Sequence, residues 1–325
     1  MLFFLILLST NFIILSSSSW FGMWVALEVN LLSIIPLMTS KSSLNSEASM
    51  KYFIIQAISS SMILFSLIIS KNFMEFTNIM AIMNLSLLLK LGVPPLHFWV
   101  PEVLEGLTWN SCFLILGPQK IGPMIMLMYM TNNLTLMLIF IISSMVVSAI
   151  LGVYQTSLRK LMAFSSMNHL GWMLSSMIFT EKIWVIYISI YTFITFLVCK
   201  LFQIFNISSI KNFSQAFSNS LLSKMMIMTS VLSLAGLPPF LGFLPKWLII
   251  LTLMENNMIL LGFLMVILTL IPIFFYIRVS MFPIILVGTN QLNLKFNLLI
   301  SHATIILSSI NTFGLIFSTC LFNVF

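Results

Sequence analysis

Four ionisable residues lie within long apolar stretches of the chain and cannot be assigned to polar loops: Glu28, Lys90, Lys120 and Lys246. A charge in apolar surroundings is costly, and residues that carry one usually face a polar interior and mark the path of an ion or a proton. Burial also brings the titration of glutamate and lysine closer to neutral pH, which proton exchange requires. These residues therefore indicate a proton relay. The alternative is that they are snorkelling or structurally paired charges.

Two histidines, His97 and His169, also lie within apolar stretches. Histidine is the side chain whose unperturbed pKa is closest to neutral, so either residue could assist proton transfer. The alternative is a hydrogen-bonded interior residue with no part in a relay. His302 stands near the start of the last apolar stretch, where we expect it at the membrane interface. Three histidines on three different predicted helices do not indicate a haem or zinc site.

A pattern of glycine and proline occurs twice in the chain. The stretch that begins Leu91-Gly-Val-Pro-Pro is matched 144 residues later by Ala235-Gly-Leu-Pro-Pro. Proline removes a backbone donor and clashes with the preceding turn, so each copy predicts an interrupted helix whose freed carbonyls face a polar interior. Paired interruptions are typical of the ion site of a transporter, whereas a simple proline kink is the alternative. The predicted helix-break residues are Gly92, Pro94, Pro95, Gly236, Pro238 and Pro239. The two copies differ chemically, because Glu102 stands where the second copy has Lys246.

The composition shows which solvent must surround the elements that position these residues. Of 325 residues, 60% are hydrophobic and only 6% are charged, with 30 Phe, 25 Met and no Asp, whereas a soluble domain is about 25% charged. The chain is therefore predicted to be a polytopic membrane protein. Its net charge of +7 is spread too thinly for a nucleic-acid surface. Its three cysteines match no metal or disulfide spacing, and no glycine-rich nucleotide loop is present.

The apolar stretches predict an all-α bundle of eleven transmembrane helices. Five helices separate the two glycine–proline patterns, and an odd number inverts the second copy, so we expect two inverted five-helix repeats with broken helices plus a C-terminal helix. The expected domains are residues 1–131, 132–280 and 281–325. The eleven spans run roughly over 1–16, 20–39, 49–70, 77–104, 109–131, 134–154, 160–180, 183–205, 225–254, 258–280 and 299–322.

The basic residues predict the orientation. With eleven spans, the side of the N-terminus carries nine Lys or Arg residues and the opposite side two, Lys71 and Lys182. By the positive-inside rule, the N-terminal side is the cytoplasmic or matrix side and the C-terminus faces outward. The chain opens on an apolar stretch without a preceding basic region, so we expect no cleavable targeting peptide. The nine residues are Lys41, Lys51, Arg159, Lys160, Lys200, Lys211, Lys224, Arg278 and Lys295.

Six passages, spread over nearly the whole chain, resemble the subunit 2 family of mitochondrial NADH dehydrogenase, an antiporter-like membrane subunit of respiratory complex I in its animal form. They are Trp24-Val-Ala-Leu-Glu-Val-Asn, Glu47-Ala-Ser-Met-Lys-Tyr-Phe, Lys90-Leu-Gly-Val-Pro-Pro-Leu-His-Phe-Trp-Val-Pro-Glu, Gln155-Thr-Ser-Leu-Arg-Lys, Ser165-Ser-Met-Asn-His-Leu-Gly-Trp and Gly236-Leu-Pro-Pro-Phe-Leu-Gly-Phe-Leu-Pro-Lys-Trp. Two features depart from the family pattern. Pro118 stands where a tryptophan is expected, and the segment 281–298 is divergent.

The resemblance assigns roles to the buried residues. It implies that Glu28 and Lys90 form the acid–lysine pair of the first half-channel, that Lys120 is the central connecting lysine, and that Lys246 is the terminal lysine of the second half-channel. His97 and His169 match the family's histidines, which are thought to assist the relay.

The resemblance also implies a proton-translocating subunit of NADH:ubiquinone oxidoreductase, located in the mitochondrial inner membrane with its N-terminus in the matrix and its C-terminus in the intermembrane space. This chain would bind no cofactor, while the parent complex uses NADH, FMN, iron–sulfur clusters and ubiquinone. The expected partners are other membrane-arm subunits and phospholipids, cardiolipin in particular, and no nucleic acid. Two alternatives remain from the residues alone: a stand-alone cation/proton antiporter, and a scaffold subunit whose buried charges only hold helices together.

Overall fold

The computed structural model describes residues 2–39, 42–72, 76–130, 133–212, 221–285 and 302–322. Within these ranges the chain is helical, and its extended pairing is limited to an isolated antiparallel bridge between Ser157 and Ser209. The chain divides into two compact units, Met1–Ser144 and Met145–Phe325. The long connections expected at 206–224 and 281–298 lie partly outside the described residues, as do Lys41 and Lys295.

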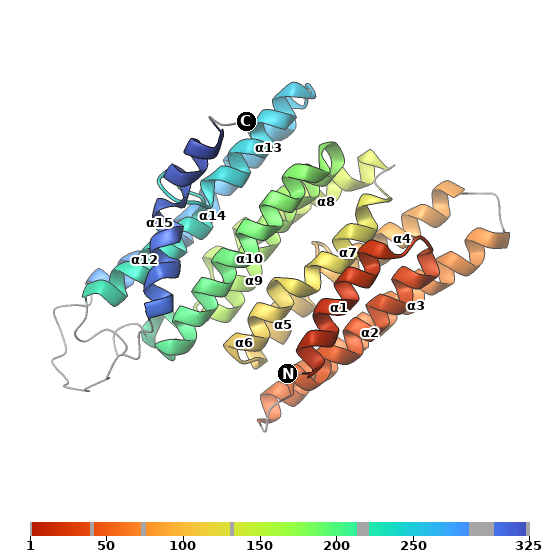
Figure 1. Ribbon diagram of the computed structural model, residues 1–325, viewed down its shortest axis with the longest axis horizontal. Coiled ribbons are helices and arrows are strands. Elements are labelled where there is room, and N and C mark those ends of the chain that lie inside the picture. The colour runs from red at the N-terminus through yellow and green to blue at the C-terminus, as the bar shows by residue number, and fades with distance from the viewer. Residues whose placement is uncertain are drawn as a thin grey trace. The chain divides into compact units, whose positions relative to one another are not determined.

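The first unit is built from seven helices and the start of an eighth (Figure 1). Helix α2 packs between α1 and α3, α3 also contacts α4 and α5, and α7 contacts α1, α2 and α4. Helices far apart in the sequence therefore surround a common interior. The helices are α1 Leu2–Ser16, α2 Trp20–Met38, α3 Ser43–Asn72, α4 Phe76–Leu91, α5 Trp99–Gly106, α6 Trp109–Leu116, α7 Pro118–Met128 and α8 Leu134–Val153.

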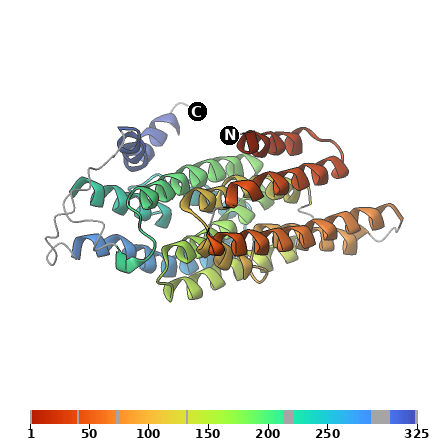
Figure 2. The same cartoon turned by 90° about the horizontal axis from the view of Figure 1, so that it is seen from below.

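The second unit is organised around α9, in which every residue from 161 to 177 is buried. Helix α9 contacts α10, α13 and α14, and α12 packs against α10, α14 and α15 (Figure 2). The core of α9 tolerates four serines because each hydroxyl donates to the carbonyl three residues earlier. The elements are α9 Leu158–Phe179, α10 Glu181–Ile204, η1 Ile210–Asn212, α12 Leu221–Ala235, α13 Phe243–Glu255, α14 Ile259–Ile285 and α15 His302–Phe322.

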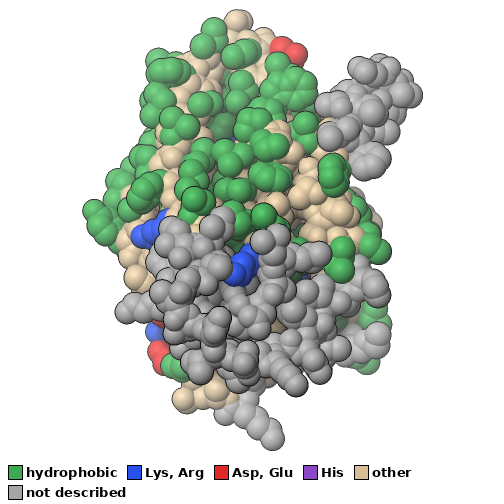
Figure 3. Space-filling model, turned by 90° about the vertical axis from the view of Figure 1, so that its left-hand side faces the viewer, with side chains coloured by type: hydrophobic (Ala, Val, Ile, Leu, Met, Phe, Trp, Pro, Cys, Tyr) green, Lys and Arg blue, Asp and Glu red, His purple; other side chains and the backbone are tan. Residues whose placement is uncertain are grey.

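The exterior of the described residues is mainly apolar, whereas the exterior of a soluble protein carries many charged side chains. Large hydrophobic side chains such as Phe12 (69% exposed) and Leu260 (75% exposed) point outward, and one face shows mainly hydrophobic side chains over its described area (Figure 3). Asn30, Asn84 and Asn311 are buried instead. Six described helices or helix pairs are long and apolar enough to cross a membrane. The predicted all-α membrane architecture is therefore confirmed at this level.

Three helical stretches are interrupted. Helix α4 ends at Leu91 and α5 begins at Trp99, while α12 ends at Ala235 and α13 begins at Phe243. The third interruption, at Gly117 between α6 and α7, differs from the single span expected over 109–131. Its cause lies in the following residue, Pro118, which occupies the first turn of α7, where its missing N–H is not needed.

Candidate functional site

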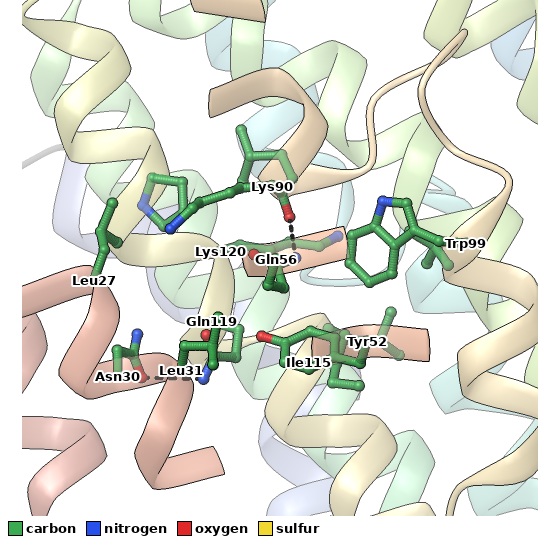
Figure 4. A pocket seen from close by; sticks show the side chains of 14 residues that line it. Leu27, Asn30, Leu31, Tyr52, Gln56, Lys90, Trp99, Ile115, Gln119 and Lys120 are labelled. Carbon is green, nitrogen blue, oxygen red and sulfur yellow. Dashed lines mark hydrogen bonds between the residues drawn. The ribbon is translucent and has the colours of Figure 1, made fainter. Parts of the chain in front are cut away.

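A small enclosed cavity in the first unit brings two of the buried lysines together (Figure 4). Its volume is about 20 Å³, room for about one water molecule. Both Lys90 and Lys120 line it, and none of the lining residues is acidic. The lining residues come from α2 to α7: Leu27, Asn30, Leu31, Tyr52, Gln56, Lys90, Leu91, Trp99, Val100, Ile115, Leu116, Gln119, Lys120 and Pro123.

Lys90 stands in the last turn of α4 and is 6% exposed. The helix ends one residue later because Gly92 has a φ of +68°, a conformation that side chains other than glycine rarely adopt. A Cβ atom on Gly92 would also lie 2.2 Å from Cγ2 of Val100 and 3.2 Å from the ring of Trp99. The interruption thus needs glycine both for its backbone and for close packing against α5.

The carbonyls around this interruption find partners on neighbouring elements. The side-chain amide of Gln56 donates to the carbonyl of Lys90 at 3.1 Å, and the indole N–H of Trp99 donates to the carbonyl of Leu89 at 3.2 Å. Ser143 of α8 donates to the carbonyl of Pro94 at 2.7 Å. Three polar groups therefore stabilise a broken helix that lipid could not solvate.

Lys120 lies just after the second interruption, near the start of α7, and is 5% exposed. Its neighbour Gln119 donates from its side-chain amide to Oδ1 of Asn30 at 3.0 Å, which ties α7 to α2. Asn11 of α1 donates to the carbonyl of Pro118 at 3.4 Å. The central lysine is thus held by amide contacts on both residues before it.

Glu28 lies at the middle of α2 and is half-buried. Its charge acts on the ammonium of Lys90, although the residue itself does not line the cavity. Within the described part of the chain, Glu28 and Lys90 do not form an ion pair with a nitrogen–oxygen distance of 4.0 Å or less, as Lys51 does with Glu47 and Glu102. The carboxylate is therefore within electrostatic range of the lysine without direct contact.

The second unit holds Lys246 at its own interrupted helix. The residue is 7% exposed, and its Nζ donates to the carbonyl of Ala235, the last residue of α12, at 2.8 Å. Gly236 follows with a φ of +75°, and a Cβ there would lie 2.8 Å from Nζ of Lys246. The space that glycine leaves is the space the lysine side chain uses.

The two histidines lie in different units. His97 stands in the segment between α4 and α5, where its Nδ1 is 3.3 Å from the carbonyl of Pro95 and its ring stacks on Phe98. His169 is buried in α9, with Nδ1 2.8 Å from the hydroxyl of Tyr187. His302 begins α15.

Several polar residues that build this site could not be predicted from the sequence. Asn30, Gln56 and Gln119 line the cavity, and Tyr52 completes one wall. The available signal was weak: amides within apolar helices resemble the many other Asn, Gln and Ser residues of this chain, and only the tertiary structure shows which helices they connect. Gly117-Pro118 carried a stronger signal, since this dipeptide is a known helix-breaking pair.

Comparison with known proteins shows which family the chain belongs to. Residues 17–272 match the family described as NADH:quinone oxidoreductase/Mrp antiporter, TM. NADH-ubiquinone oxidoreductase chain 2 of Locusta migratoria is 39% identical over 97% of this chain and 95% of its own length. The protein of that name from Anopheles gambiae is 40% identical over 97% of this chain and 95% of its own length. The chain belongs to the NADH-ubiquinone oxidoreductase chain 2 family. The predicted resemblance is confirmed.

Solved structures share the fold of this chain 2 family member. A chain of respiratory complex I from Thermus thermophilus matches with a TM-score of 0.77 at 18% identity, covering 94% of this chain and 76% of that one. A chain of the archaeal membrane-bound sulfane sulfur reductase matches with a TM-score of 0.81 at 16% identity, and the match covers 99% of this chain and 73% of that one. At such identities the likeness concerns the fold alone, which is the antiporter-like fold expected for chain 2.

Proposed function

We propose that this chain translocates protons across the mitochondrial inner membrane as a membrane-arm subunit of NADH:ubiquinone oxidoreductase, driven by quinone reduction in other subunits. Membership of the chain 2 family supports the assignment to the complex. The observation that carries the transport role is the enclosed cavity that Lys90 and Lys120 line together without an acidic side chain.

Two lysines on one small cavity favour proton exchange. Ammonium groups that line one cavity repel each other, so protonation of one lysine would favour release of a proton from the other. A proton that reaches the neutral amine of Lys90 forms an ammonium, and its transfer to the neutral amine of Lys120 through a water in the cavity restores Lys90. In the proposed relay, protonation of Glu28 removes a negative charge that attracts the Lys90 ammonium, and this change sends the proton onward.

The proposed mechanism includes the remaining predicted residues. Lys246 serves as the terminal proton site of the second unit, where the end of α12 supplies its acceptor. His97 and His169 assist, since each has one ring nitrogen positioned by a neighbouring oxygen. The helix-break residues hold the lysines at helix ends.

The proposed architecture has eleven spans, in which α4 with α5, α6 with α7, and α12 with α13 each form one interrupted span. Two inverted five-helix repeats, over 1–131 and 132–280, precede the C-terminal segment 281–325. The N-terminus lies in the matrix and the C-terminus in the intermembrane space. The basic residues on the N-terminal side support this orientation.

The proposed partners are other membrane-arm subunits and phospholipids, with cardiolipin the expected lipid. NADH oxidation and quinone reduction, with the FMN and iron–sulfur clusters they require, are assigned to other subunits. Among the described residues, no three His, Cys, Asp or Glu side chains gather closely enough to hold a metal ion. This chain contributes proton transfer through its own side chains.

Substitution of Lys90 in the assembled complex tests the proposal. Lys90→Arg keeps the charge but cannot release a proton, because arginine stays protonated. We expect proton uptake in membrane vesicles to be lost and quinone reductase turnover to fall about a hundredfold, the low end of what a positioned proton-transfer group contributes. Lys90→Met and Glu28→Gln should give the same loss of proton uptake with assembly retained. Lys182→Arg, at an exposed lysine, is the matched control and should behave as wild type.

The alternatives predict different results. A scaffold subunit needs only the charge, so a fully active Lys90→Arg complex would contradict the relay. A stand-alone antiporter would exchange cations for protons in vesicles that contain this chain without the redox subunits, and such activity would contradict the dependence on quinone reduction.

A further inference from the structure

A second hollow opens on the surface of the first unit, between α3 and α5. Its volume is about 400 Å³. Three glutamates and one lysine surround it, and Lys51 bridges Glu47 at 2.9 Å and Glu102 at 3.1 Å. These charged side chains are about half exposed, so the hollow is a wet, charged surface. The residues that line it are Leu44, Glu47, Ala48, Lys51, Glu102, Glu105 and Gly106.

The hollow and the buried lysine cavity share two walls. Along α3, the hollow is lined up to Lys51, and the cavity begins with the next residue, Tyr52. Along α5 the order is reversed: Trp99 and Val100 line the cavity, and Glu102 lines the hollow. Neighbouring residues of a helix are about 1.5 Å apart along its axis, so the residues that line the two spaces are separated by less than one helical turn on each helix.

An aromatic pair lies at this boundary between the two spaces. The rings of Tyr52 and Trp99 meet edge to face, with centroids 5.8 Å apart, and the residues are only 3% and 7% exposed. Both side chains lie on the cavity side in Figure 4. The seam between α3 and α5 thus has two cross-links: the ion pair of Lys51 with Glu102 at the hollow, and the aromatic pair at the cavity.

The aromatic pair is also connected to Lys90. The indole N–H of Trp99 donates to the carbonyl of Leu89, the residue just before Lys90, at 3.2 Å. Gly92, two residues after Lys90, leaves the space that Trp99 and Val100 occupy. A change in the position of the last turn of α4 must therefore displace the Trp99 ring, and displacement of that ring would open the seam.

We propose that the seam between α3 and α5 is the route by which water and protons reach the lysine cavity, and that Tyr52 and Trp99 form its gate. This inference rests on the proposed proton translocation. When the rings separate, water connects the hollow with the cavity, and a proton passes along it to the neutral amine of Lys90, which becomes an ammonium. When the rings meet, packed aromatic surface excludes water from the seam.

Cysteine labelling tests the route without relying on pumping. The reporter is Leu31→Cys, because Leu31 lines the cavity on α2 and is 3% exposed. It is placed in an assembled complex whose native cysteines have been replaced. Methanethiosulfonate ethylammonium is added to membrane vesicles from the face at which Ser43→Cys, an exposed position beside the hollow, reacts. We expect slow modification with the native gate and about tenfold faster modification with Trp99→Ala or Tyr52→Ala, as removal of a small barrier gives.

The controls separate the gate from general loosening. Trp24→Ala removes an indole of α2 that bonds α3 through the carbonyl of Ser60 and that lines neither space; it should leave the labelling rate unchanged. Trp99→Phe keeps an aromatic ring but loses the hydrogen bond to the carbonyl of Leu89, so we expect a labelling rate between those of the native and alanine complexes. This variant keeps the test informative if the alanine variants assemble poorly. Equal rates in all gate variants, or labelling only from the opposite face, would overturn the inference.

A second measurement distinguishes this inference from the proposed function. Faster labelling in the gate variants, together with loss of pumping in Lys90→Arg, supports both proposals. Faster labelling in a complex where Lys90→Arg pumps normally keeps the access route and rejects the relay. Unchanged labelling where Lys90→Arg abolishes pumping keeps the relay and rejects this route.

Discussion

At the scale of single residues, Lys90, Lys120 and Lys246 each lie beside an interruption between two helices. The carbonyls at the C-terminal end of a helix carry partial negative charge and lack partners within the helix. Lys246 donates to such a carbonyl, that of Ala235, and Lys90 occupies the last turn of α4. A helix end holds an ammonium less firmly than a carboxylate in direct contact does. This arrangement is the one that the proposed proton exchange requires.

The fit of Lys246 against Gly236 gives a sharp prediction. A Cβ on residue 236 would lie 2.8 Å from Nζ and 2.9 Å from Cδ of the lysine, and the φ of +75° adds strain. The left-handed conformation alone costs an alanine about 1–2 kcal/mol. We expect Gly236→Ala to displace Lys246 from the carbonyl of Ala235, to lower the thermal transition of the assembled complex and to reduce proton uptake.

Gly262→Ala is the matched control for that substitution. Gly262 lies in helix α14, and a Cβ there would approach no closer than 3.7 Å to Leu253, an ordinary contact. Alanine in a helix is usually more favourable than glycine, so stability and proton uptake should be unchanged or slightly higher. If Gly236→Ala and Gly262→Ala had the same stability and the same proton uptake, the packing of Lys246 against Gly236 would not be needed for function.

The ionisable members of the site could be predicted from the sequence, whereas their polar neighbours could not. Glu28, Lys90 and Lys120 stand out because a charge inside an apolar stretch is anomalous on energetic grounds. Asn30 and Gln119 do not, because an amide is tolerated in many places and its role depends on which helix it meets. The sharing of one cavity by two lysines is likewise a property of the tertiary fold.

At the scale of helices, the interruptions are structural elements with their own hydrogen-bonding partners. Ser143 and Gln56 satisfy carbonyls at the interruption after α4, and Asn11 satisfies one at the start of α7. Each partner comes from a different helix, so each interruption also fixes how its neighbours pack. The glycine–proline pattern predicted the interruptions α4–α5 and α12–α13. It did not predict the one at Gly117, because a proline such as Pro118 is common in the first turn of a helix and does not by itself show that another helix ends just before it.

Restoring a continuous helix should remove function while leaving assembly in place. Replacing Pro238 and Pro239 together with alanine gives the segment between α12 and α13 the backbone donors and freedom to extend α12. An extended α12 would withdraw the carbonyl of Ala235 from Lys246. We expect quinone reductase turnover linked to proton uptake to fall, with normal amounts of assembled complex on native gels.

Pro36→Ala is the control for this element, because Pro36 lies inside α2, which continues through it to Met38. Removal of that proline changes no interruption, so turnover and proton uptake should stay near wild type. Full pumping by the Pro238 and Pro239 double variant would show that the interruption is incidental to transport.

At the scale of the whole molecule, the two units use the repeated pattern differently. The offset of 144 residues aligns Glu102 with Lys246, but the structure shows that they are not equivalent. The side chain of Glu102 is 59% exposed and pairs with Lys51, whereas Lys246 is 7% exposed and contacts a helix end. Sequence repetition therefore predicted where helices break, but not which copy carries a buried charge. Hydrophobic periodicity does not show which copy carries the buried charge either, because both segments are apolar.

The orientation of the whole chain is open to direct measurement. The N-terminal side carries nine basic residues against two, and positive residues are retained on the side from which a membrane protein is inserted. Single cysteines at Ser43 and Asn256, both exposed, lie on opposite predicted faces. We expect a membrane-impermeant maleimide to label Ser43→Cys only from the matrix face, and Asn256→Cys only from the intermembrane-space face.

These two sites also test the number of spans between them. Seven predicted spans separate Ser43 from Asn256, with the interrupted pairs α4–α5, α6–α7 and α12–α13 each counted as one crossing. An odd number of crossings places the two residues on opposite faces, whereas a segment that enters and returns on one side would place them together. Labelling of both cysteines from one face would therefore reject the inverted relation of the two repeats, even if the matrix location of Ser43 held. Opposite labelling fixes the relation that alternating access across the membrane requires.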